Sequence, residues 1–246
     1  MTAASGNKAG GDKIDWPALW ANGDLARFCF ISLGILLHAT NETMIGDIAG
    51  VQFVGWSLAV YELGAIVAGA AAGRLVSFVA LRTNMIAAAL LYAAGALVCA
   101  TAPSMPVFLA GRLVEGLGGG ALVSLAFVSV ERLFPRNIWP QLFGIISAIW
   151  GVAAFSGPML GAIMVDFLSW RWAFGVFTFG GAAMALASFA VLGTPQAKRP
   201  QAGAGPTPAF PFLALGCLAV SVVLIAAAGV DIALLRSSLL ILLGLA

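Results

Sequence analysis

Charged side chains are scarce in this chain. Asp, Glu, Lys and Arg make up 9% of its 246 residues, whereas they make up roughly 25% of an ordinary soluble domain. The shortage excludes a solvated surface over most of the chain, and together with 61% hydrophobic residues it indicates a membrane protein. The net charge of +2 is spread between apolar segments without a basic cluster, so no nucleic-acid partner is expected.

Histidine and cysteine are also scarce, with one and three residues. Cys29, Cys99 and Cys217 stand singly in apolar segments, without the pair spacing of a metal or redox motif, and we interpret them as small core hydrophobes. The sequence has no glycine-rich phosphate-binding loop, so energy from ATP would need another subunit. These absences argue against a metal site, a cofactor and a soluble enzyme.

Long apolar runs are what the chain has instead. A helix needs about 20 residues to cross a hydrocarbon core of about 30 Å, and runs of this length without alternation indicate helices, because a helix satisfies its own backbone in lipid. The predicted spans are 25–46, 54–75, 84–103, 107–129, 142–165, 172–192 and 210–229, with another beginning near 237. The predicted fold class is an all-α membrane protein.

Short connections and one linker suggest how the chain is organised. Residues 1–24 are predicted to form a cytoplasmic tail that ends in an interfacial helix, DWPALW, in which Asp15 is the N-cap. Residues 25–192 are expected to form a six-span bundle, 193–209 a cytoplasmic linker rich in Pro and Gly, and 210–246 a seventh span and part of an eighth. Lys and Arg concentrate in the tail and in every second loop, which places the N-terminus in the cytoplasm.

Two charged residues lie inside the predicted span 107–129, in FLAGRLVEGLGGG. Arg112 and Glu115 are three residues apart, so they share one helix face. Placing such groups at a span centre costs about 2.5–3.5 kcal/mol each before pairing. Together with a further acid, Glu62, at a similar depth, the two residues favour a proton or cation site. The alternative is a static buried ion pair, of Arg112 with Glu115 or Glu62, that holds helices in register.

Further polar residues are expected at a similar depth. Glu62 lies in WSLAVYELG, about eight residues into a span that runs in the same direction as 107–129. The first span ends in HATNET, which adds His38, Asn41 and Glu42. We interpret Glu62, Glu115 and Glu42 as candidate proton carriers, whereas His38 is expected to be a wetted residue near the helix end.

Small residues and one proline mark places where helices pack or bend. Glycines recur four residues apart, as in Gly116 and Gly120, and such spacing lets backbones approach closely in membranes. The stretch WGVAAFSGPMLGA has Pro158 in mid-helix between Gly157 and Gly161. A proline there bends the helix, and the bend is either a fixed kink or a hinge between two states of a carrier.

Several of these stretches resemble the major facilitator superfamily, most closely its bacterial drug:proton antiporters, including the 14-span branch. GRLVEGLGGG resembles the family's span 4 motif, SGPMLGA its antiporter motif in span 5, WSLAVYELG the aromatic start of span 2, and WRWAF the entry to span 6. The resemblance covers residues 25 to about 192. It implies a bundle of two inverted three-helix repeats, and a proton-transfer role for Arg112 and Glu42.

The resemblance also implies two further groups of site residues. Residues at the substrate cavity or its gate would be Trp56, Tyr61, Gly157, Pro158 and Gly161. The cytoplasmic gate would include Gly73, Arg82, Glu131 and Arg136. The loop after the second span departs from the family pattern, because Ser77 stands in place of its Asp and Ala80 in place of its second Gly.

Together these observations predict the N-terminal half of a proton-coupled efflux carrier of the bacterial inner membrane, which exports small amphipathic or drug-like molecules. It would use the proton gradient and no cofactor. Its expected partners are the lipid bilayer, the small-molecule substrate, and a missing C-terminal half or a second copy. The alternative is a non-transporting half-carrier fragment that acts only through helix packing, and an intramembrane enzyme is a weaker third hypothesis.

Overall fold

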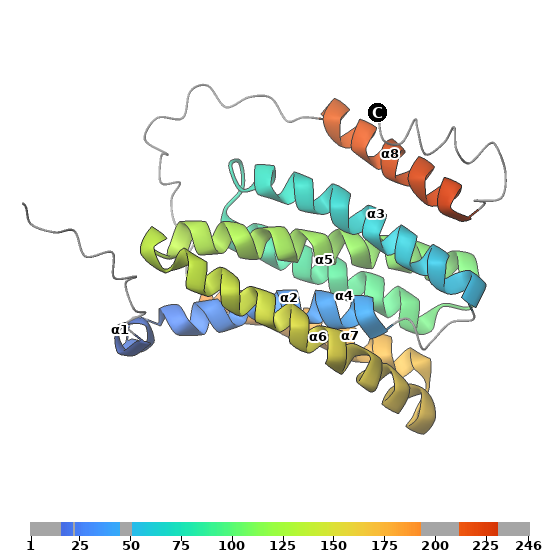
Figure 1. Ribbon diagram of the computed structural model, residues 1–246, viewed down its shortest axis with the longest axis horizontal. Coiled ribbons are helices and arrows are strands. Elements are labelled where there is room, and N and C mark those ends of the chain that lie inside the picture. The colour runs from blue at the N-terminus through green and yellow to red at the C-terminus, as the bar shows by residue number, and fades with distance from the viewer. Residues whose placement is uncertain (1–15, 22, 45–50, 193–211, 231–246) are drawn as a thin grey trace, which may run out of the picture.

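A computed structural model describes residues 16–21, 23–44, 51–192 and 212–230. The helices are α1 (Trp16–Ala21), α2 (Asp24–Met44), α3 (Val51–Leu75), α4 (Leu81–Thr101), α5 (Met105–Leu133), α6 (Trp139–Phe167), α7 (Trp170–Val191) and α8 (Phe212–Val230), with a 3-10 turn η2 (Arg136–Ile138) before α6. Figure 1 shows them as one helical bundle, and the described residues contain no strand. The all-α fold class is therefore confirmed.

The helix ends agree with the predicted spans to within about one turn. Among the described residues, five helices are long and apolar enough to cross a membrane: α3 from Gly55, α4, α5, α6 together with η2, and α7. Helix α2 is not among them, because the polar residues of HATNET lower its hydropathy. The predicted linker 193–209 and the span beginning near 237 lie outside the described residues.

Helix α5 lies at the centre of the bundle. It packs extensively against α3 and α4, and also against α2. Helix α4 also packs against α7, and α2 packs against both α6 and α7. Helix α8 contacts α3, and Figure 1 shows it on the side of α3 that faces away from α5. Side chains on α5 therefore reach three neighbouring helices at once.

Glycines let α3 and α5 touch backbone to backbone. A Cβ atom at Gly116 would meet the backbone of Tyr61, and one at Gly120 would meet the backbone of Ala65. Residue numbers rise from one contact to the next on both helices, from 116 to 120 on α5 and from 61 to 65 on α3, so the two helices run parallel. The close approach predicted for Gly116 and Gly120 is confirmed, and it sets Tyr61 level with Gly116.

The contact of α4 with α5 is equally close but antiparallel. A Cβ atom at Gly118 would meet the backbone of Tyr92, and one at Gly95 would meet the backbone of Glu115. Here the residue numbers on α4 fall as those on α5 rise, which is the pattern of antiparallel helices. Helix α5 therefore turns different glycines toward different neighbours, which fixes how far along its axis each neighbour lies.

The interpretation of the cysteines was right for one of the three. Cys99 is fully buried, whereas Cys29 and Cys217 lie on the surface of the bundle. A membrane bundle presents apolar side chains to lipid as well as to its core, so an apolar setting in the sequence does not distinguish the two faces.

Candidate functional site

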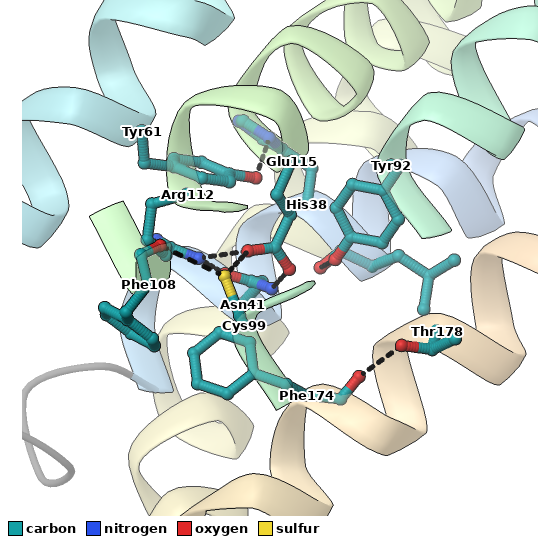
Figure 2. A network of polar contacts seen from close by, with 11 residues as sticks. His38, Asn41, Tyr61, Tyr92, Cys99, Phe108, Arg112, Glu115, Phe174 and Thr178 are labelled. Carbon is teal, nitrogen blue, oxygen red and sulfur yellow. Dashed lines mark hydrogen bonds and ion pairs between the residues drawn. The ribbon is translucent and has the colours of Figure 1, made fainter. Parts of the chain in front are cut away.

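Arg112 and Glu115 form the centre of a buried polar network, and the structure adds Asn41 from α2 to it (Figure 2). The Arg112 Nη1 atom donates to Glu115 Oε2 at 2.6 Å and to Asn41 Oδ1 at 2.6 Å. The Asn41 amide in turn donates to Glu115 Oε1. All three residues are fully buried. We name this closed set, Arg112, Glu115 and Asn41, the central network; it links α2 to α5.

Aromatic rings surround the Arg112 guanidinium. Its Cζ atom lies 4.1 Å from the centre of the Tyr61 ring and 5.8 Å from that of Phe174, and cation–π attraction at such distances stabilises a desolvated guanidinium. The rings of Phe108 and Phe174 pack edge to face, with their centroids 5.4 Å apart. Cys99 Sγ lies 3.8 Å from Glu115 Oε2. The network is thus held between apolar walls, where a charge is tolerated only if it is paired.

Two guanidinium atoms of Arg112 remain without a hydrogen bond. Nε and Nη2 have no partner among the described residues, although both are buried. The ion pair is made with Glu115 and not with Glu62, which decides between the two partners considered for Arg112 from the sequence. Arg112 therefore keeps unused donors beside its ion pair.

His38 belongs to a second polar group next to this network. Its Nδ1 atom lies 2.7 Å from the Tyr61 hydroxyl, and the two rings stack with centroids 5.4 Å apart. The Trp150 ring on α6 packs against the same imidazole at a steep angle, with ring centroids 5.6 Å apart, and the Nε2 atom lies 3.8 Å from Glu42 Oε2. The expectation of a wetted helix-end residue is wrong, because His38 is 5% exposed and is enclosed by α3, α5 and α6.

Glu42 and Glu62 lie beside each other at the edge of this region, close enough for their carboxyl groups to interact directly. Each is partly buried, and each has one buried oxygen, Glu42 Oε2 and Glu62 Oε1, without a hydrogen bond among the described residues. Because Tyr61 is level with Gly116, Glu62 lies close to the depth of Glu115, as the sequence predicted. The predicted carboxylates thus divide into Glu115 inside the central network and a pair outside it.

An open cleft of about 320 Å³ reaches His38 between α3 and α5. Small residues line much of it, among them Ala65, Gly69 and Gly120. Since the glycines carry no side chain, the space between the helices stays open beside the close backbone contact. One face of the His38 environment therefore adjoins the surface of the bundle.

Helix α6 contributes Gly157, Pro158 and Gly161. Gly157 packs on Thr43 of α2, and the Thr43 hydroxyl reaches the Ala153 carbonyl at 3.0 Å. Pro158 lies inside α6, which continues to Phe167, and its side chain is exposed. The proline thus does not end the helix, and its role as a kink or a hinge stays a prediction.

The remaining predicted site residues lie near the helix ends. Trp56 is 37% exposed on α3. Gly73 faces Ser124, while Arg82 lies over the Phe189 ring at 4.8 Å and Arg136 over the Trp139 ring at 5.5 Å. Glu131 is exposed at the end of α5. Their joint role as a cytoplasmic gate stays a prediction.

Two residues that complete the site, Asn41 and Tyr92, were not predicted from the sequence. Asn41 was noted only as a polar neighbour, yet it bonds both charged groups of the central network. Tyr92 donates to the Leu37 carbonyl at 3.1 Å and holds α4 to α2. The available signal was the spacing of His38, Asn41 and Glu42, which puts three polar side chains on neighbouring positions of one helix.

Comparison with known proteins places the chain in a large group of transporters. The family model described as Major Facilitator Superfamily matches residues 25–246. A probable multidrug-efflux transporter of Mycobacterium tuberculosis is 31% identical over 201 residues, which cover 77% of this chain and 43% of the relative. Multidrug resistance protein 3 of Bacillus subtilis is 28% identical over 150 residues, 58% of this chain and 29% of the relative. The chain spans less than half the length of these curated relatives.

A solved structure supports the same fold. A mutant of a peptide transporter, POT, crystallised with alafosfalin, superposes with a TM-score of 0.61, covering 87% of this chain and 50% of that one. At 16% sequence identity this likeness concerns the fold alone. The six long helices α2 to α7 therefore have the arrangement of half a solved transporter.

Proposed function

This chain belongs to the Major Facilitator Superfamily, and we propose that it forms half of a proton-coupled carrier that exports small amphipathic or drug-like molecules by alternating access. Its family and relatives are transporters and not enzymes, and it is a multi-pass membrane protein. The proposal adds the energy source, the direction of transport and the substrate class. It also places the chain in the bacterial inner membrane with a cytoplasmic N-terminus.

The observation that carries the proposal is the central network. Arg112, Glu115 and Asn41 are fully buried in a bundle whose other core residues are mostly apolar. An ion pair that served only to fix two helices would be replaceable by apolar residues at little cost or with a gain in stability. Here the pair lies next to two more carboxyl groups, Glu42 and Glu62, which a packing role does not require.

The geometry suggests how a proton acts on this site. When Glu115 is ionised, it neutralises Arg112 and accepts from Asn41. A proton on Glu115 removes its charge, so Arg112 is left with the Asn41 carbonyl and the surrounding rings as partners. A buried cation without its counter-ion is costly, and the bundle relieves that cost by admitting water or another anion. Protonation of one carboxyl thereby favours a different arrangement of α2 and α5.

Alternating access requires a second six-helix half, because a carrier of this kind rocks one half against the other around a midplane site. The second half is either part of the same polypeptide or a second copy. The names of two relatives, a probable multidrug-efflux transporter and a multidrug resistance protein, support small, chemically varied molecules as substrates, and the apolar character of the bundle favours amphipathic ones.

Substrate-driven proton release from proteoliposomes tests the proposal. The whole protein, reconstituted with a pH-sensitive dye inside the vesicles, is expected to move protons when a lipophilic drug cation is added. Glu115→Gln and Glu62→Gln are each expected to lower the initial rate at least about tenfold, which corresponds to about 1.4 kcal/mol. Asp166→Asn is the matched control, because Asp166 is exposed near the end of α6, and it is expected to retain the wild-type rate.

Two results would contradict the assignment. Unchanged proton release in both Glu115→Gln and Glu62→Gln would exclude these carboxyl groups as proton carriers. Drug transport without any proton release by the wild-type protein would exclude proton coupling itself. If the 246-residue chain shows no transport while a longer product of the same gene does, the chain alone is a half-carrier fragment.

A further inference from the structure

His38 occupies a position that the proposed proton carriers alone do not explain. It is the only histidine in the sequence, and its exposed fraction is 5%. One ring nitrogen, Nδ1, contacts the Tyr61 hydroxyl, while the other, Nε2, faces Glu42. The imidazole also borders the cleft between α3 and α5. We name Glu42 and Glu62 the outer carboxyl pair. The His38 side chain thus borders the cleft, faces one member of this pair, and contacts Tyr61, whose ring covers Arg112.

A glycine on α5 makes room for this arrangement. A Cβ atom at position 119 would lie 2.6 Å from His38 Nδ1 and 2.6 Å from the Tyr61 hydroxyl oxygen. Both distances are far shorter than a van der Waals contact. Both atoms belong to side chains, so a methyl group at position 119 would have to displace the imidazole, the phenol or both. Gly119 therefore permits the contact, and any larger residue would separate the two rings.

We propose that His38 is a proton-relay residue of the carrier, which exchanges a proton with Glu42 and reports its charge state to Arg112 through Tyr61. The inference rests on the proposed function and names a residue and a path for it. The contacts that support this path are those of His38 with Glu42 and with Tyr61, and that of the Tyr61 ring with Arg112.

The exchange is a simple proton transfer. The O–H bond at Glu42 Oε2 breaks and an N–H bond forms at His38 Nε2, which leaves an imidazolium beside a carboxylate. The 3.8 Å separation must shorten by about 1 Å, because a hydrogen bond between nitrogen and oxygen spans 2.7–3.2 Å. A rotation of the partly exposed Glu42 side chain supplies that movement. The reverse transfer returns the proton to Glu42.

Tyr61 passes the change in charge on toward Arg112. Neutral His38 that accepts a proton at Nε2 carries its own proton on Nδ1 and donates it to the Tyr61 hydroxyl oxygen, and the imidazolium keeps this hydrogen bond with a charged donor. Because the same phenol ring lies 4.1 Å from the Arg112 guanidinium, the new positive charge acts on the central network.

The charged and titratable groups around His38 come from four helices. Glu42 on α2, Tyr61 on α3 and Arg112 on α5 act on His38 itself. Glu62 on α3, Tyr92 on α4 and Glu115 on α5 act on those three groups. Helix α6 contributes the uncharged Trp150 ring. Proton exchange at His38 therefore has one carboxyl partner, Glu42, and takes place in the field of a permanent cation.

A single histidine makes the relay directly observable. With ¹⁵N-labelled histidine, an affinity tag that lacks histidine, and any histidine outside these 246 residues replaced by glutamine, the protein in lipid nanodiscs gives ring-nitrogen signals from His38 alone. Tyr61→Phe is expected to change the Nδ1 signal, because its hydrogen-bond partner is lost. Glu42→Gln is expected to move the midpoint of the pH titration by about half a unit or more, because a nearby carboxylate is lost. Signals unchanged in both variants would overturn the inference.

Transport measurements provide the second arm. His38→Gln keeps a hydrogen-bonding side chain but binds no proton in this pH range, so the pH dependence of drug-driven proton release is expected to flatten while drug binding persists. Gly119→Ala is expected to do the same without removing any titratable group. Its control is Gly151→Ala, because a Cβ atom at Gly151 meets nothing within 4 Å.

The outcomes separate this inference from the proposed function. An unchanged pH profile in His38→Gln, alongside a loss of proton release in Glu115→Gln, would overturn the relay and leave proton coupling in place. Drug transport without proton release in the wild-type protein would overturn both. In that case the ¹⁵N signals would still show whether His38 senses Tyr61 and Glu42. If His38→Gln fails to fold, the relay is tested by the pH profile of Gly119→Ala and by the ¹⁵N titration of the wild-type protein. An unchanged pH profile in Gly119→Ala would then overturn the relay.

Discussion

Helices α5 and α6 have the same length, 29 residues each, and α5, like α6 together with η2, is apolar enough to cross a membrane. Their surroundings differ greatly. In α5, 56% of the most apolar stretch is buried inside the bundle, whereas in η2 and α6 together only 17% is. Helix α5 carries the ion pair and five glycines that touch neighbours, while α6 carries a proline and an outward apolar face.

The comparison shows that hydropathy measures suitability for a membrane and not position within a bundle. A helix that faces lipid and one that faces other helices are both apolar. Helix α5 differs from α6 in two features. It has glycines on several faces, which let neighbouring helices approach closely, and it carries charged groups that are buried and paired with each other. The candidate site therefore lies where the backbone is held most tightly, and three predictions test that contrast.

The largest effect is expected from breaking the ion pair at the centre. Arg112→Met leaves Glu115 buried without its cation, and removing one partner of a buried pair costs about 3–5 kcal/mol. Arg112→Met combined with Glu115→Met is expected to recover most of this loss. The measurement is reversible unfolding in mixed detergent and SDS micelles, with Arg136→Met as the control, because Arg136 is exposed next to α6.

Equal stability of the single and double variants would contradict the arrangement of the central network. A loss of similar size in Arg136→Met would contradict the contrast between centre and periphery.

A smaller effect is expected from adding one methyl group. Gly120→Ala places a Cβ atom against the backbone of Ala65 on α3, and overpacking of this kind costs roughly 1–3 kcal/mol. Gly151→Ala on α6 enters open space and is expected to leave stability unchanged or to raise it slightly, since alanine favours helix over glycine. Thermal midpoints from fluorescence-detected size exclusion compare the two. Equal midpoints would show that the α3 and α5 backbones are not in contact.

Much of the fold followed from the sequence, and the reasons are physical. A helix that crosses lipid must be long and apolar, so the ends of α3, α4 and α7 were predictable to about one turn. The pairing of Arg112 with Glu115 followed from their spacing of three residues on one helix. The parallel run of α3 and α5, and the common depth of Glu62 and Glu115, followed from the alternating direction of consecutive spans.

The contacts between distant helices were not predictable. The role of Asn41 depends on α2 lying against α5, and nothing in the local sequence sets that rotation. The burial of His38 depends on the missing side chain of Gly119 on another helix. Cys29 and Cys99 look alike in sequence, yet one faces outward and the other faces Glu115. Such choices arise from tertiary packing, which a single helix does not encode.

The smallest effect is expected at the contact of α2 with α6. The Thr43 hydroxyl lies within 3.2 Å of three carbonyls, those of Ala39, Thr40 and Ala153, and its one proton serves one of them at a time. Thr43→Val keeps the shape and removes the hydroxyl, so stability is expected to fall by about 1 kcal/mol. Ser147→Ala on α6 is the control, because its hydroxyl bonds only within its own helix. A larger loss in the control would contradict a specific link between α2 and α6.

The glycines of α5 have a practical consequence for measurements of movement. Where two helix backbones touch, no flexible side chain lies between them that could change its rotamer and alter their separation. The distances between α5 and its neighbours α3 and α4 are therefore expected to stay constant. Spin labels on the outer faces of α4 and α5 would therefore supply an internal ruler. A distance from α5 to α6, read in the same sample, is then interpretable as a displacement of α6 and not as a deformation of the reference.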